Sequence, residues 1–230
     1  MFYPYGFGFD STIVYLLPAM IFALYAQSKV NTTFSRYLRV STYKGYSGYD
    51  VARSILDQNG LRDVPIEMAP GRLSDHYDPR NRVLRLSREV YNGNSIASVS
   101  VAAHEVGHAL QHAGGYIPLS FRNAMFPIAR FGSSAAWFFI IAGFLVLPEL
   151  MNIGILLYSA AVLFQIVTLP VELNASSRAL KLLDNNGFIT KDEYGPSQKV
   201  LKAAALTYVA AMATAIAQLL RLIAIRNRRR

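Results

Sequence analysis

Four stretches of the chain contain no Asp, Glu, Lys or Arg, and each is 18 to 22 residues long. They cover residues 11–28, 131–148, 150–171 and 203–220. A helix needs about 20 apolar residues to cross a bilayer. The pattern predicts a mainly α-helical integral membrane protein with a helical transmembrane bundle. The first stretch has no basic leader and no small-residue cleavage site, so we expect a retained anchor.

Two polar segments separate these stretches. The first, 29–122, carries 12 Lys and Arg against 8 Asp and Glu, and the second, 172–202, carries 5 against 4. No basic residue precedes the first stretch, and none lies between the second and third. Basic residues favour the cytoplasmic side, so we expect the N-terminus outside and both polar segments in the cytoplasm. The net charge of +9 is then mainly a topology signal, and we expect no nucleic-acid partner.

The fourth stretch is ambiguous. It is rich in Ala, with Thr207, Thr214 and Gln218 interspersed. Counting spans places the C-terminus outside, whereas the arginines at 226 and 228–230 favour the inside. A crossing helix and an interfacial helix both fit this pattern.

The first polar segment shows a local order of elements. The hydrophobic spacing predicts a short amphipathic helix over 49–59 that ends at Gly60, and strands over 64–68 and 82–86. Residues 75–79 have the composition of a turn. A longer helix is expected from an N-cap at Ser95 to about Ala113, before Gly114 and Gly115. These elements predict a small α+β, zincin-like catalytic unit.

That longer helix contains the sequence His104-Glu105-Val106-Gly107-His108, which uses two of the four histidines in the chain. Residues four apart share a helix face, so both imidazoles can bind one metal ion. Glu105 lies about 100° further round the helix, where it can take a proton from metal-activated water. Zinc is favoured, and iron(II) can use the same ligands. The chain has no Cys, which excludes thiolate zinc sites, Cys nucleophiles and disulfides.

The candidates for a third ligand are His112, His76 and Glu172. His112 shares the face of the motif but lies about 6 Å further along the axis. Glu172 follows a stretch of 22 uncharged residues and Pro170, and begins a helical run. A carboxylate isolated at a membrane boundary is costly and usually functional. On the residues alone, all three candidates stay open.

Three segments together carry a family resemblance: 103–111 around the motif, 75–79 with 84–87 upstream, and 170–176 downstream. Nearly the whole chain resembles the YugP-type membrane neutral zinc metallopeptidases. More distantly, it is similar to the HtpX-type and CAAX-prenyl-protease-type membrane peptidases. In those families a Glu-x-x-Ala-Asp segment supplies the third zinc ligand, and Glu172 to Ala175 matches its start. Ser176 stands where that pattern has Asp, which leaves Asn174, Ser176 or another acid to orient a metal-bound histidine.

The resemblance implies a membrane-embedded zinc endopeptidase with one zinc ion. It implies that His104, His108 and Glu172 bind zinc and that Glu105 is the general base. His76, Tyr77 and Arg178 are candidates for contacts with the oxyanion or the substrate. Substrates are expected to be membrane or membrane-proximal proteins, presented extended to the strand over 82–86.

The expected organisation has five regions: an anchor in 1–28, the catalytic segment in 29–123, two transmembrane helices in 124–171, the third-ligand helix and a cytoplasmic connection in 172–202, and an apolar helix with a basic tail in 203–230. Two rival functions are a non-proteolytic membrane scaffold that keeps a structural metal and a metal-dependent lipid or ester hydrolase. A closed structural site would need four protein ligands and no Glu105.

Overall fold

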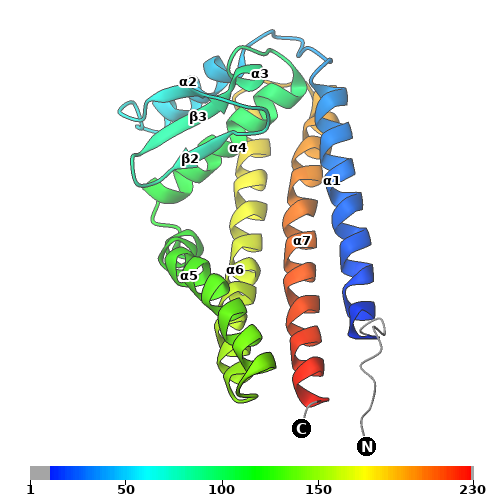
Figure 1. The fold of residues 1–230 in the computed structure, drawn as a ribbon. Helices are drawn as coiled ribbons and strands as arrows, with labels where there is room; N and C mark the ends of the chain where they lie inside the picture. The colour runs from blue at the N-terminus through cyan, green and yellow to red at the C-terminus, as the bar shows by residue number, and fades with distance from the viewer. Residues whose placement is uncertain (1–10, 229–230) are drawn as a thin grey trace, which may run out of the picture. The chain divides into compact units, whose positions relative to one another are not determined.

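The computed structural model describes residues 11–228, and it is mainly helical (Figure 1). A short 3₁₀ helix covers Ser11–Tyr15. The α-helices are α1 (Leu17–Tyr37), α2 (Gly48–Gln58), α3 (Arg88–Tyr91), α4 (Ile96–Ala113), α5 (Ile117–Leu145), α6 (Leu150–Asn185) and α7 (Lys191–Asn227). The strands are β1 (Ile66–Ala69), β2 (His76–Asp78) and β3 (Val83–Ser87).

Four helical segments are long and apolar enough to cross a membrane: Thr12–Tyr37, Ile117–Leu145, Leu150–Asn185 and Lys191–Asn227. Each overlaps one of the four uncharged stretches, which confirms the predicted fold class. Each is also longer than its stretch. In particular, α6 continues without a break through Pro170 and Glu172, so the prediction that a separate helix begins at Glu172 is wrong.

The chain forms two compact units. The apolar unit contains the described residues up to Tyr25, Arg122–Val167 and the residues from Val209. The polar unit contains Ala26–Phe121 and Thr168–Tyr208. Helices α1, α5, α6 and α7 therefore contribute residues to both units. The expected metal ligands all belong to the polar unit.

Glycines bring α5 and α6 close together within the apolar unit. A Cβ on Gly154 would lie 2.6 Å from Cγ1 of Ile140, and one on Gly143 would collide with the backbone of Met151. Small residues let helix backbones approach where hydrophobic burial between helices contributes little. The loop between these helices is short, so it holds the end of α5 beside the start of α6.

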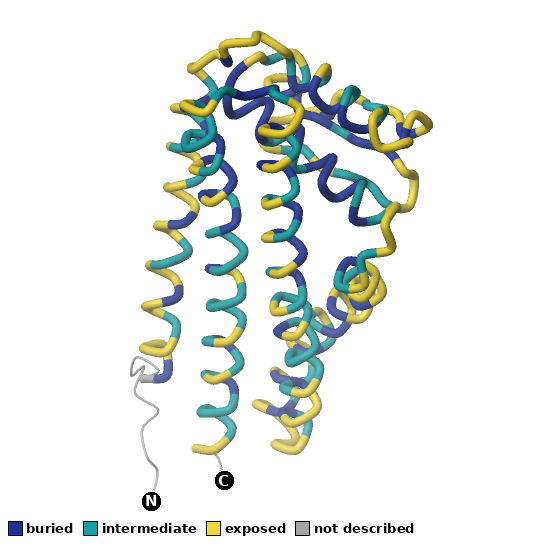
Figure 2. The backbone as a smooth tube through the Cα atoms, turned by 180° about the vertical axis from the view of Figure 1, so that it is seen from behind, coloured by how far each residue is buried: buried dark blue, intermediate teal, exposed yellow. Residues whose placement is uncertain are grey.

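The polar unit is built round α4, which is buried along most of its length (Figure 2). Its core includes the fully buried Val99 of α4 and, from other elements, Ile55, Leu84, Leu86 and Leu183. Helix α2 begins with a capping box between Ser47 and Asp50, which satisfies two free N–H groups at the helix start.

The sheet has three strands in the order β1-β3-β2. β1 pairs with β3 in parallel, and β2 pairs with β3 antiparallel. The expected strands over 64–68 and 82–86 are present with shifted ends. The expected turn over 75–79 instead contains β2, because His76–Asp78 pair with Val83–Arg85. β3 is the central strand, with partners on both edges, so the prediction that it receives an extended peptide is wrong.

Asp78 holds the turn between β2 and β3. Its carboxylate accepts hydrogen bonds from the Asn81 side chain, from the backbone N–H groups of Arg80 and Asn81, and from Arg85. These donors, Asn81 foremost, lower the pKa of Asp78 to about 2. The carboxylate therefore contributes stability above its ordinary pKa and loses it as the pH falls through about 2.

Replacing Asp78 with Asn should destabilise the polar unit by about 1 kcal/mol near neutral pH, because the charged acceptor is lost. Unfolding by denaturant in detergent, followed from pH 7 downward, should show the gap between wild type and variant closing as the pH approaches 2. Asp192→Asn, at an exposed position, is the matched control. A gap that stays constant with pH would contradict this account.

Candidate metal centre

The local sequence sets the two ends of α4. The Ser95 hydroxyl accepts the N–H of Ser98 at the start of the helix. At the other end Gly115 has a φ of 61°, and the N–H of Tyr116 bonds to the carbonyl of Gln111. The predicted helix over 95–113 is thus confirmed. It carries both motif histidines on one face, with their rings 4.8 Å apart.

Glu172 of α6 meets these histidines. One oxygen of its carboxylate, Oε2, lies 3.3 Å from Nε2 of His104 and 3.4 Å from Nε2 of His108. Within the described part of the chain, the three side chains form a group that could hold a metal ion, with ligand atoms all within 4.8 Å of one another. Glu172 and His108 are buried and His104 is partly buried.

A close approach of two helix backbones makes this meeting geometrically feasible. A Cβ on Gly107 of α4 would lie 2.9 Å from the carbonyl oxygen of Ala175 on α6. Only a residue without a side chain fits this contact, and Ala175 is itself small and fully buried. Gly107 lies one residue before His108, and Ala175 lies three residues after Glu172. The contact therefore sets the distance between the histidines and the carboxylate.

Hydrogen bonds orient both imidazoles through their Nδ1 atoms. Nδ1 of His108 lies 3.0 Å from Oε1 of Gln111, and Nδ1 of His104 lies 3.2 Å from the Ser176 hydroxyl. The Gln111 amide nitrogen donates to the Val171 carbonyl and to Asn174, so its oxygen must face His108. His108 therefore carries its proton on Nδ1 when neutral, which leaves the Nε2 lone pair toward Glu172.

The negative charges around His108 favour the protonated, cationic form of its imidazole. Burial lowers the pKa of His108, but the hydrogen bond and charge of Glu172, with the charge of Glu105, outweigh burial and raise it above the ordinary value. Two imidazole Nε2 atoms and a carboxylate around one point are also a donor set that zinc prefers. The residues present therefore fit a divalent metal.

Glu105 is held by the edge strand of the sheet. Its Oε2 accepts the backbone N–H of Tyr77 in β2 at 3.0 Å, and the side chain is buried. Nearby, Asp75 accepts hydrogen bonds from the backbone and hydroxyl of Ser87. Burial raises the pKa of Asp75, and the negative charge of Glu105 adds to this effect. β2 and α4 therefore pack against each other beside the expected base (Figure 1).

The other candidates have different positions. His76 is exposed, and its Nδ1 bonds to the Ser74 carbonyl, so it holds its own turn. The Tyr77 hydroxyl lies 2.9 Å from Nδ1 of His112, and His112 is not part of the possible metal cluster. Arg178 donates to Asn174 at 2.8 Å and lies over the Tyr116 ring.

Gln111 is the important residue that the sequence did not reveal. It joins His108 to Asn174, and Asn174 in turn accepts from Arg178. Its position three residues after His108 is the one available signal, because residues three apart share a helix face. Of the residues expected to orient the histidines, Ser176 contacts His104 directly and Asn174 acts on His108 through Gln111.

A family model described as "Putative neutral zinc metallopeptidase" matches residues 12–227. The chain belongs to this family. It is also 49% identical over 210 residues to "Putative membrane protease YugP" of Bacillus subtilis (strain 168), a match that covers 91% of this chain and 93% of the relative. No solved structure matches the chain. The resemblance drawn from the motifs is thus confirmed.

Replacing Gly107 with Ala should weaken zinc binding by about tenfold or more, because α6 must move away and carry Glu172 with it. Zinc affinity of the purified protein, measured by competition with a chelator, tests this. Gly195→Ala is the matched control, since Gly195 also lies in a helix and a Cβ there meets nothing within 4 Å. Equal affinities in the two variants would show that the α4–α6 contact does not set the ligand geometry.

Proposed function

We propose that this protein is an integral-membrane zinc endopeptidase in which His104, His108 and Glu172 hold one zinc ion. The convergence of two imidazole Nε2 atoms on one carboxylate oxygen carries the proposal. When bound, zinc polarises water and lowers its pKa to about 7. Three protein ligands in the described residues leave a fourth position for water, as in catalytic rather than structural zinc sites.

Glu105 is the general base of the proposed reaction. It neighbours the ligands on α4 without belonging to the ligand cluster, and the N–H of Tyr77 orients one of its oxygens. The other oxygen accepts a proton from the attacking water and passes it to the leaving amine when the peptide bond breaks. Its buried position strengthens these electrostatic effects.

We assign substrate binding to β2 rather than to β3. β2 pairs with β3 along one edge, and no strand of the described residues pairs with its other edge. Tyr77 of β2 contacts Glu105, so a peptide beside this strand would lie next to the proposed base. Addition of an extended peptide to a free strand edge is a common recognition mode. His76 on the same strand is exposed and is a candidate substrate contact.

Variants of Glu105 and Glu172 should distinguish the role of a general base from the role of a zinc ligand. Glu105→Gln should leave zinc bound and lower turnover at least about 100-fold, because the general base is lost. Glu172→Gln should instead lose zinc, because an amide is a poor ligand for it. Zinc content and hydrolysis of a labelled casein, both on purified full-length protein, distinguish the two effects.

Glu149→Gln, at an exposed position between α5 and α6, is the control and should retain zinc and turnover. Full activity in Glu105→Gln would refute the enzymatic proposal. Unchanged zinc affinity in Glu172→Gln would refute the ligand assignment alone.

We also propose that the protein is a multi-pass cell-membrane protein whose catalytic segment faces the cytoplasm. Lys29, Arg36, Arg39 and Lys44 follow the first apolar stretch closely, and no basic residue precedes it. Substrates would then be membrane proteins or segments near the inner face of the membrane.

Gln58→Cys tests this topology, because Gln58 is exposed at the end of α2 and the chain has no other cysteine. A membrane-impermeant thiol reagent should label this cysteine in lysed cells and leave it unlabelled in intact cells. The matched reporter is Glu149→Cys in the loop between α5 and α6, expected on the opposite side. Labelling of Cys at position 58 in intact cells would place the catalytic segment outside.

A further inference from the structure

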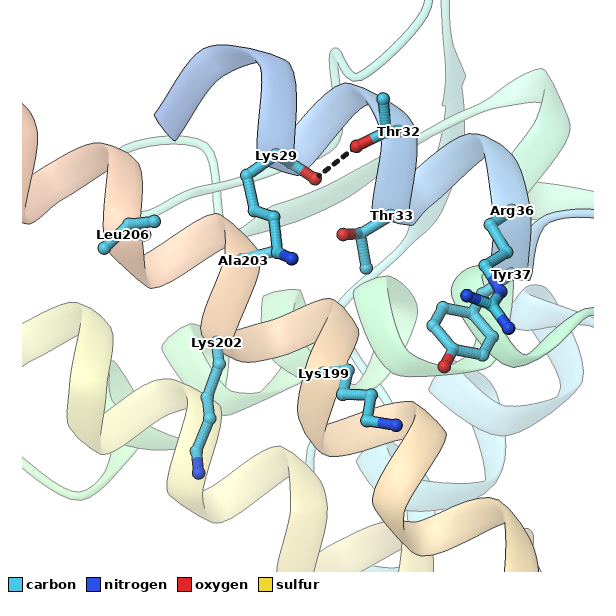
Figure 3. Close-up of a pocket in the computed structure, with 9 residues that line it drawn as sticks. All are labelled: Lys29, Thr32, Thr33, Arg36, Tyr37, Lys199, Lys202, Ala203 and Leu206. Atoms are coloured by element: carbon cyan, nitrogen blue, oxygen red, sulfur yellow. Dashed lines mark hydrogen bonds between the residues drawn. The ribbon is translucent and has the colours of Figure 1, made fainter. Parts of the chain in front are cut away.

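A cavity lies between α1 and α7 within the polar unit, and none of the expected metal ligands lines it. Its volume is about 570 Å³, and its lining includes Lys29, Thr33 and Arg36 from α1 with Lys199, Lys202 and Leu206 from α7 (Figure 3). None of the residues that the proposed reaction uses lines this cavity. The cavity therefore needs an explanation separate from the proposed reaction.

The cavity is strongly cationic. Four of its nine lining residues are Lys or Arg, and none is Asp or Glu. Among residues 11–228, none of these four cations forms a salt bridge, whereas several other arginines of the polar unit do: Arg53, Arg72, Arg82 and Arg85. Four like charges gathered without a counter-charge repel one another, so an anion in the cavity would relieve that repulsion.

The cavity also offers a hydroxyl donor. The Thr32 hydroxyl bonds to the carbonyls of Ser28 and Lys29 in its own helix. The Thr33 hydroxyl has no such bond within the described residues, and Figure 3 shows it on the side of α1 that faces Ala203. A neutral donor beside ammonium and guanidinium groups suits an anion with several acceptor oxygens, such as a phosphate group.

The place of the cavity along the two helices indicates where that phosphate comes from. Lys29 directly follows the uncharged stretch 11–28, and Lys202 directly precedes the uncharged stretch 203–220. Both helices therefore change from apolar to charged at the cavity. In a membrane-spanning helix this change marks the level of the lipid headgroups. The apolar side of the cavity, at Ala203 and Leu206, suits the start of acyl chains.

We propose that this cavity binds the phosphate of an anionic phospholipid headgroup. Lys29, Arg36 and Lys199 are the charged contacts, and Thr33 donates its hydroxyl. The bound lipid joins the first and last long helices of the chain at the membrane surface. The proposal does not depend on the peptidase reaction, because the cavity shares no residue with the metal cluster.

The test compares two triple variants of the full-length protein in neutral detergent. Lys29→Gln/Arg36→Gln/Lys199→Gln removes three charges from the cavity. Arg80→Gln/Arg88→Gln/Lys191→Gln removes three exposed charges elsewhere in the polar unit. The two triple variants therefore have the same net charge. Phosphatidylglycerol and phosphatidylcholine are titrated into each protein, and native mass spectrometry measures the bound fraction.

Wild type and the control variant should bind phosphatidylglycerol in preference to phosphatidylcholine. The cavity variant should bind it at least about tenfold more weakly, since each basic residue near anionic lipid contributes roughly a fivefold factor in affinity. Lys29→Arg/Lys199→Arg keeps the charges and should bind as wild type does. Single Lys29→Gln and Lys199→Gln variants provide the same comparison if the triple variant cannot be purified.

Inorganic phosphate and glycerol 3-phosphate are titrated in parallel, with thermal stabilisation as the readout. If they bind as tightly as the lipid and depend on the same three cations, the cavity serves a soluble phosphate and the lipid assignment is overturned. Equal lipid binding by the cavity and control variants would overturn the proposal entirely. Zinc content of every variant is measured alongside, so failure of the lipid site is distinguishable from failure of the metal site.

Discussion

A buried carboxylate between two imidazoles is the constraint on which the polar unit depends. Glu172 is 3% exposed, and burying a charge without a partner costs several kcal/mol. The two imidazoles offset this cost as partners of Glu172. They reach it because α4 packs against α6 at Gly107, where no side chain separates the backbones. The caps of α4, the packing of β3 and α2 on it, and the hydrogen bonds of Gln111 all serve to hold this one approach.

Much of this arrangement is readable in the sequence because its signals are local. The absence of charged residues predicts the four spans. Ser95 and the glycines that follow Ala113 predict the two ends of α4. The spacing of His104 and His108 places them on one helix face whatever the rest of the chain does. Glu172 could be named because it is an isolated carboxylate and matches a family segment, although the residues alone left His112 and His76 open.

The remaining features depend on partners distant in sequence. β2 is only three residues long and has the composition of a turn, and its extended form comes from pairing with β3 and from the bond between Tyr77 and Glu105. Pro170 is a signal of a helix boundary, because its ring crowds the preceding turn and it lacks an N–H donor. Membrane-spanning helices nevertheless tolerate proline, and α6 continues through Pro170. The role of Gln111 follows from residues 60 and 63 positions away, which no local pattern encodes.

The groups that orient the two histidines have one consequence for reactivity. Nδ1 of His104 contacts the Ser176 hydroxyl and Nδ1 of His108 contacts the Gln111 amide, so both partners are neutral. Ser176 stands where the distantly similar segment has an aspartate. With a neutral rather than an anionic partner at Nδ1, an imidazole gains less imidazolate character and donates less electron density. A dipositive ion held by these rings would therefore keep more of its Lewis acidity. Such a centre would hold its ion less tightly and would polarise a bound oxygen more strongly.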